Sequence, residues 1–145
     1  MRTRSARLAI GAGLLGLVLV ATAAALAFAG RGSPPVTDVE IVIHYSKFTP
    51  SEIAVPVGVP VTITLRNDDP IDHEWIVGDA AVHELHRTGT ELLHPSRPTE
   101  VVIPAGETRV TTITFEQAGS LQYICHLPAH EAYGMVGVVS IVRER

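Results

Sequence analysis

Alternating apolar and polar residues are the feature that most constrains how this chain can fold. Apolar side chains occupy every second position from Val39 to Tyr45, and the stretch from Phe48 to Asn67 alternates on both sides of Gly58. Alternation with period two, interrupted by Gly, Pro and Asn, is typical of short antiparallel β-strands with one buried face. Further strand signals lie at 74–77, 99–103, 109–115, 120–125 and 134–142.

Eight short strands separated by turn signals predict an all-β fold, a Greek-key β-sandwich. The segment from Gly78 to Pro98 lacks strand alternation, and within it Ala80 to Arg87 could form one or two helical turns. The residues predicted to fill the core are Phe48, Val55, Ile63, Leu65, Trp75, Ile113, Phe115, Val138 and Ile141.

The N-terminus carries an export signal. Three arginines within the first seven residues precede an uncharged, mostly apolar run from Leu8 to Ala29. The length of the run favours a membrane anchor, whereas Ala27-Phe28-Ala29 is a small-x-small cleavage signature, so both alternatives stay open. The arginines place the N-terminus in the cytoplasm and the domain outside.

These signals predict three parts: a signal peptide or single transmembrane anchor helix at 1–30, a linker at 31–38 and one domain at 39–145. The domain is expected to be extracytoplasmic, anchored by the N-terminal helix or released after cleavage near Ala29. Beyond Arg31 the chain has seven Lys and Arg against fifteen Asp and Glu, a net charge of −8. This acidic balance argues against a nucleic-acid partner.

The only cysteine, Cys125, lies in a loop with His130 five positions on and Met135 five positions beyond that. Thiolate, imidazole and thioether together suit copper, and His73 is the best candidate for a second imidazole. Each residue also has a structural interpretation. Cys125 and Met135 could be core residues, and His73 could be a surface histidine at the start of a strand.

The loop resembles the copper-binding segment of the cupredoxins, the blue copper proteins. The spacing Cys-x4-His-x4-Met, with Pro128 and Gly134 inside it, looks most like rusticyanin and the type-1 segment of multicopper oxidases. The run Phe48-x-Pro-x-x-Ile-x-Val55 is similar to the opening half of many cupredoxins, and the resemblance spans roughly residues 39–143. It implies one type-1 copper per domain, with a plane of His73, Cys125 and His130 and an axial Met135.

Three positions depart from the family patterns. Ile124 stands where the oxidase segment has its first histidine, and no His-x-His pair exists for a second copper centre, which predicts that the chain is not an enzyme. Glu74 stands where many cupredoxins have Asn or Ser, and Glu131 directly follows His130. We expect these carboxylates to lower the reduction potential.

Five other histidines need an interpretation. His44 lies in the middle of a predicted strand and is expected to be structural. His126 is expected beside the site or on the surface rather than among the ligands. The remaining three lie between the strands, and they form either a solvated polar loop or a second, weaker metal site or lid. These are His83, His86 and His94.

The resemblance implies an extracytoplasmic carrier of single electrons between redox partner proteins, membrane-bound or periplasmic. The alternative is a periplasmic or cell-surface protein that binds copper for tolerance or delivery. We expect a monomer, attached to the membrane only through its N-terminal segment.

Overall fold

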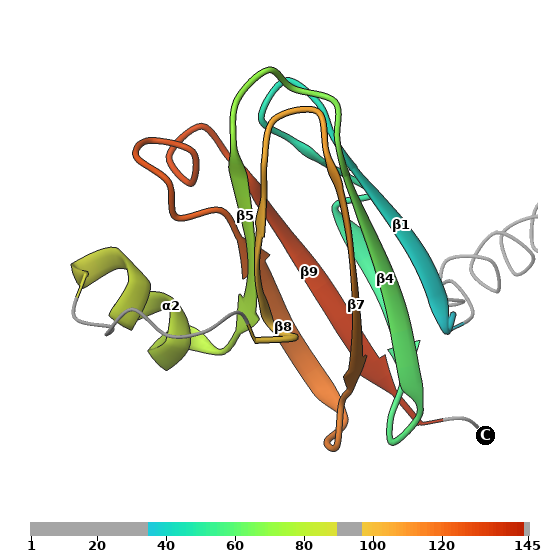
Figure 1. Ribbon diagram of the computed structural model, residues 1–145. Helices are drawn as coiled ribbons and strands as arrows, with labels where there is room; N and C mark the ends of the chain where they lie inside the picture. Colours follow the sequence, from blue (N-terminus) through green and yellow to red (C-terminus); the bar gives the residue numbers. More distant parts are fainter. Residues whose placement is uncertain (1–34, 90–96, 144–145) are drawn as a thin grey trace, which may run out of the picture. The chain divides into compact units, whose positions relative to one another are not determined.

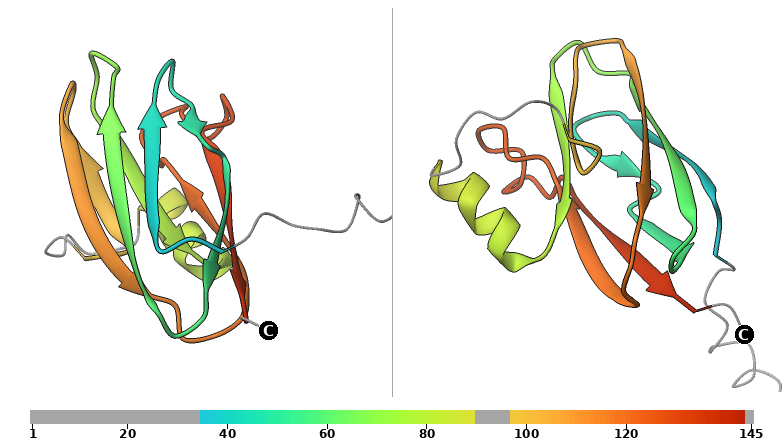
Figure 2. Two further views of the ribbon diagram at one scale, coloured as in Figure 1. Left: turned by 90° about the vertical axis from the view of Figure 1, so that its right-hand side faces the viewer. Right: turned by 60° about the horizontal axis from the view of Figure 1, so that its bottom comes forward.

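The computed structural model describes residues 35–89 and 97–143, which form two β-sheets packed face to face (Figures 1 and 2). The four-stranded sheet has the order β2-β1-β4-β7. Its strands are β1 (Asp38–Ile43), β2 (Phe48–Thr49), β4 (Pro60–Asn67) and β7 (Thr108–Thr114). The five-stranded sheet has the order β3-β9-β8-β5-β6. Its strands are β3 (Glu52–Pro56), β5 (His73–Gly78), β6 (Glu100–Ile103), β8 (Gly119–Ile124) and β9 (Val136–Val142).

The predicted β-sandwich is confirmed as a mostly β fold, but its strands are not all antiparallel. β1 pairs in parallel with β4, and β3 pairs in parallel with β9. The chain crosses from one sheet to the other at Pro50 and Ser51, which divides the strand expected from Phe48 onward into β2 and β3. The described residues therefore contain nine strands, where the alternation alone predicted eight.

Eight of the nine predicted core residues are buried, and Val138 is the exception because it is only partly buried. Along β9 the inward positions are Gly137, Val139 and Ile141. Side chains alternate between the two faces of a strand, and the buried Met135 just before β9 follows the same alternation, with odd-numbered residues inward. The prediction that Val138 lies in the core was therefore wrong by one position along the strand, because its neighbour Val139 points inward instead.

The single glycine inside β9 accommodates the buried ring of Tyr123. A Cβ added at Gly137 would lie 2.1 Å from Cζ of that ring. Tyr123 is fully buried, and its hydroxyl donates a hydrogen bond of 2.9 Å to the carbonyl of Pro50, so the ring cannot move aside freely.

We therefore expect Gly137→Ala to lower the free energy of unfolding by about 3 kcal/mol, the upper range for an overpacked core. Urea unfolding of the metal-free chain measures this loss, with Ser140→Ala on the same strand as the control. A loss below about 0.5 kcal/mol would contradict the close approach, because that is the scale of ordinary surface substitutions.

One helix, α2 (Ala80–Thr88), lies between β5 and β6, as the sequence allowed. Asp79 caps its N-terminus by accepting hydrogen bonds from the backbone N–H groups of Ala81 and Val82. Gly89 ends it in the left-handed conformation. Figures 1 and 2 show α2 next to the loop between β8 and β9. Within residues 35–89 and 97–143, no helix has the length and hydropathy to cross a membrane.

The predicted anchor or signal segment at 1–30 lies outside the described residues, as do the first half of the linker at 31–38 and His94. The domain boundaries drawn from the sequence therefore stay predictions.

Candidate metal centre

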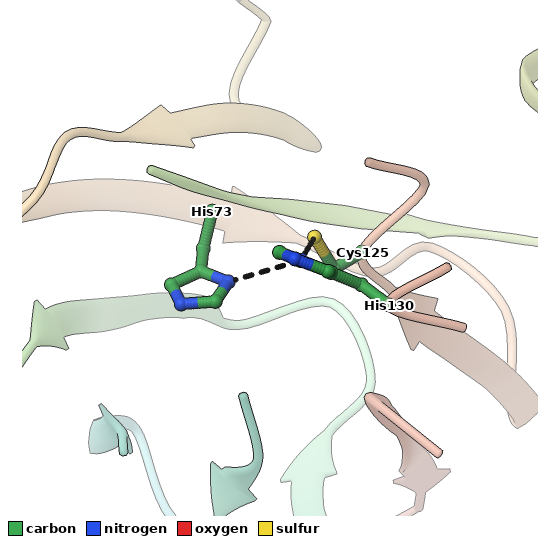
Figure 3. A group of neighbouring side chains, drawn as sticks. All are labelled: His73, Cys125 and His130. Carbon is green, nitrogen blue, oxygen red and sulfur yellow. Dashed lines mark hydrogen bonds between the residues drawn. The ribbon is translucent and has the colours of Figure 1, made fainter. Parts of the chain in front are cut away.

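Three of the four predicted copper ligands come together at one end of the sandwich (Figure 3). His73 begins β5, Cys125 directly follows β8, and His130 lies in the loop that leads to β9. Ligand atoms of the three residues all lie within 4.8 Å of one another. Nδ1 of His130 is 3.3 Å from Nδ1 of His73 and 3.2 Å from the sulfur of Cys125.

Backbone hydrogen bonds close the loop between β8 and β9 on itself. The N–H of His130 donates to the carbonyl of Leu127 at 3.0 Å, and the N–H of Met135 donates to the carbonyl of His130 at 3.0 Å. The N–H of Cys125 donates to the carbonyl of Met135 at 3.2 Å. Met135 is fully buried, and its backbone is hydrogen-bonded to the backbones of Cys125 and His130. Its axial role stays a prediction.

The donor set fits copper. Two imidazole nitrogens bound to one ion at about 2.0–2.1 Å lie roughly 3.3 Å apart at a near-tetrahedral angle, close to the separation found here. One thiolate with two imidazoles is the ligand type of blue copper sites. His73 and Cys125 are fully buried, and His130 is partly exposed. The residues therefore fit a copper ion with two buried ligands and one ligand, His130, that is partly exposed to solvent.

The backbone of Glu74 supports the cysteine. Its N–H points at the sulfur of Cys125 at 3.3 Å. Burial raises the pKa of the Cys125 thiol, partly offset by the Glu74 and Leu127 amides, so metal binding must displace a proton. Burial also raises the pKa of the Glu74 carboxyl, against the influence of His86 and the backbone N–H of His126. Glu74 therefore links the two ligand segments.

Asp69 orients His73, a role that sequence reasoning missed. Its carboxylate accepts hydrogen bonds from the backbone N–H groups of Tyr45 at 2.7 Å and Ser46 at 2.8 Å. Its Oδ2 also lies 3.0 Å from Nε2 of His73. Because a carboxylate only accepts, Nε2 carries the hydrogen and Nδ1 presents its lone pair toward Cys125 and His130.

The electrostatics of this pair agree with that assignment. Burial alone would raise the pKa of Asp69, but the amides of Ser46 and Tyr45 and the imidazole of His73 outweigh it and lower the pKa. Burial lowers the pKa of His73, against the opposing effect of Asp69. The pair therefore holds an ionised carboxylate beside a neutral imidazole, the form that binds metal. His44 is exposed, with Nδ1 3.5 Å from Asp69.

A second group of histidines lies beside the first. Nδ1 of His83 is 3.0 Å from Nε2 of His126, and the ring of His86 stacks on His126 with centroids 5.3 Å apart. His83 is fully buried, and the His126 side chain is 4% exposed. The interpretation of this segment as a solvated loop is therefore wrong for His83, because α2 presses it against the ligand loop.

Glu131 does not present an unpaired charge. Nε and Nη2 of Arg87 donate to its carboxylate at 2.6–3.1 Å. These bonds are the main cause of the lowered pKa of Glu131. The Glu131 charge is therefore paired with an arginine on α2, an interaction that no local pattern indicates. Its expected effect on the reduction potential stays a prediction.

The buried imidazoles make the stability of the metal-free chain depend on pH. Burial, with His83 second, lowers the pKa of His126 from 6.5 to about 4, and burial also lowers the pKa of His83. In this window the unfolded chain binds more protons than the folded chain, so stability falls as the pH falls from about 6.5 toward 4. We expect His126 alone to cost about 2 kcal/mol between about pH 7 and pH 5.

Urea unfolding of the metal-free chain at these two pH values measures the loss, and His126→Gln should reduce it. Equal or greater stability of the unsubstituted chain at the lower pH would contradict the burial of neutral histidines in the folded state.

Comparison with known proteins identifies the class to which this chain belongs. A family model for the cupredoxin-like domain matches residues 14–138. The chain therefore belongs to the cupredoxin-like family.

Two curated relatives are copper-resistant cuproproteins called CopI. The protein from Pseudomonas aeruginosa is 27% identical over 135 residues, covering 71% of this chain and 75% of the relative. The protein from Rubrivivax gelatinosus is 31% identical over 99 residues, covering 66% of this chain and 59% of the relative.

Solved structures of auracyanins share the fold. Dithionite-reduced auracyanin from Roseiflexus castenholzii superposes with a TM-score of 0.64 at 22% identity, covering 75% of this chain and 99% of that structure. Auracyanin A, a blue copper protein from Chloroflexus aurantiacus, superposes with a TM-score of 0.58 at 25% identity, covering 75% and 100%. The predicted family is confirmed, and the likeness of the loop spacing to rusticyanin stays a prediction.

Proposed function

We propose that the chain is a type-1 copper protein that carries single electrons between redox partners. One copper would be held by His73, Cys125 and His130, with Met135 as a fourth ligand, and it would supply a one-electron Cu(II)/Cu(I) couple there. The observation that carries this proposal is the mutual approach of the three donor atoms within 4.8 Å in a buried site.

The ligands are held by bonds that do not depend on the metal. Asp69 fixes the ring of His73, the Glu74 amide points at the sulfur, and the loop carbonyls and amides fix His130. Ligands that barely move between the two oxidation states of copper suit fast electron transfer, and the partly exposed His130 offers the edge nearest to a partner.

We further propose that the domain works outside the cytoplasm, on membrane-bound or periplasmic redox partners, as a monomer. The N-terminal apolar run supports this location. No part of the proposal requires a chemical reaction at the site other than electron exchange, so an enzymatic activity is not expected.

Copper tolerance is the second candidate function, favoured by the two copper-resistant relatives. A tolerance protein must take up copper and hold or release it, whereas a carrier must keep its copper through many electron exchanges. The two functions therefore differ in how readily the metal leaves.

The test loads the full-length chain with one equivalent of Cu(II) and records visible absorption and electron paramagnetic resonance. An intense thiolate-to-copper band with narrow copper hyperfine splitting supports a type-1 site, and a pale tetragonal signal contradicts it. Fast electron self-exchange, with copper retained against a chelator, then favours the carrier. Ready copper loss, together with copper sensitivity of cells lacking the gene, favours tolerance.

A further inference from the structure

We propose that the facing imidazoles of His83 and His126 bind a second metal ion, a divalent ion that prefers nitrogen ligands, Cu(II) before Zn(II). Neither residue belongs to the Cys125 centre, and both side chains are buried where α2 meets the ligand loop. The ligand atoms are Nδ1 of His83 and Nε2 of His126.

The separation of these atoms fits two ligands of one ion. At metal–nitrogen distances of about 2.0–2.1 Å, two imidazoles lie roughly 2.9 Å apart at a right angle and roughly 3.4 Å apart at a tetrahedral angle. The observed 3.0 Å falls within that range. A linear two-histidine Cu(I) site would need about 4 Å from the same bond length, so the geometry favours the divalent ion.

The positions of the ring N–H hydrogens on His83 and His126 also favour a cation between them. Nε2 of His83 is 3.3 Å from the carbonyl oxygen of Gln122, which only accepts, so Nε2 carries the one hydrogen of a neutral imidazole. Nδ1 of His83 therefore presents a lone pair to His126. Nδ1 of His126, in turn, lies 3.5 Å from a carboxylate oxygen of Glu131.

A neutral His126 has one hydrogen for two acceptors. With that hydrogen on Nε2, a lone pair on Nδ1 faces the Glu131 carboxylate. With it on Nδ1, the two lone pairs of His83 and His126 face each other at 3.0 Å. An ion between the two lone pairs resolves the second arrangement and leaves Nδ1–H directed at Glu131, the carboxylate–histidine–metal arrangement common in metal sites.

Two neighbours hold His126 in this position. The ring of His86 stacks on it at an interplanar angle of 19°, and Arg87 fixes the carboxylate of Glu131. The ligand chemistry contains imidazole but no thiolate or thioether, which suits Cu(II) and Zn(II) rather than Cu(I). Because His126 directly follows Cys125, a positive ion here would also raise the reduction potential of the first centre.

The experiment starts from the full-length chain carrying one equivalent of copper, recognised by its thiolate band. A second equivalent of Zn(II), or in a parallel sample Cu(II), is added, and bound metal is counted after equilibrium dialysis. We expect two ions per chain, and with Cu(II) a second, tetragonal resonance with nitrogen hyperfine structure. His83→Gln should reduce the count to one with the thiolate band unchanged, and His44→Gln, at an exposed histidine, should leave it at two.

A measurement without substitution guards against misfolding of the His83 variant. Nitrogen-15 resonances of the histidine rings are followed while Zn(II) is added to the copper-loaded chain after reduction to the diamagnetic Cu(I) form. Shifts at His83 and His126, with His44 unchanged, support the site. A count of one in the unsubstituted chain, or an unchanged count in a folded His83→Gln variant, would overturn the proposal. Failure of the type-1 centre would instead appear as a missing thiolate band at the first equivalent.

Discussion

Replacing Cys125 with serine will abolish the intense visible absorption of the copper-loaded chain. The band requires a thiolate bonded to Cu(II), and Cys125 is the only cysteine in the sequence. The hydroxyl of serine is a harder oxygen donor that keeps its proton at neutral pH, so it binds copper far more weakly than a thiolate does. Absorption and electron paramagnetic resonance at one equivalent of Cu(II) measure the change.

The control is His44→Gln, which should keep the band because His44 is exposed and outside the ligand set. The metal-free serine variant should remain folded, since its hydroxyl can still accept from the Glu74 amide. Persistence of an intense band in the serine variant would mean that Cys125 is not the ligand, and the proposed function would fail with it.

Removing the carboxylate of Asp69 will weaken both the fold and the metal site. In Asp69→Ala the amides of Tyr45 and Ser46 and Nε2–H of His73 lose their acceptor. Partly buried donors without partners cost about 1–3 kcal/mol each at full burial, so we expect a loss of about 3 kcal/mol in unfolding free energy. We also expect copper affinity to fall 10–100-fold, as is typical when the partner of a metal-ligating histidine is removed.

Urea unfolding of the metal-free chain and competition with a copper chelator measure the two effects separately. Asp68→Asn is a matched control on the neighbouring residue, where an exposed ion pair with Arg66 contributes at most about 1 kcal/mol. Asp69→Asn should fall between the two, because its amide oxygen can still accept. Unchanged affinity in folded Asp69→Ala would show that His73 is oriented by other contacts.

The sequence predicts those parts of the molecule that depend on residues close together in the chain. Alternation predicted the sandwich and eight of its core residues, and the spacing within one loop predicted Cys125 and His130. His73 was predicted because a copper site needs another imidazole. In each case the physical cause, a strand face or a set of ligand types, acts over a few neighbouring residues.

The rest depends on contacts between distant segments. Asp69 lies in the turn between β4 and β5, four positions before His73, but its carboxylate is held in place by the amides of Tyr45 and Ser46, more than twenty positions earlier in the chain. The pairing of His83 with His126 joins residues 43 positions apart through a helix whose docking no pattern specifies. The parallel pairs of strands likewise follow from a crossover between sheets, which period-two alternation cannot report.

The parallel register of β1 and β4 has a practical consequence. Asp38 pairs with Thr62 and Ile43 with Asn67, and Asn67 opens the turn that leads to His73. The chain therefore begins β1 about 17 Å from the metal-binding end, at five residues of strand rise. A surface or electrode linked through the residues before β1 would attach at the opposite pole, leaving the metal-binding pole facing the solution.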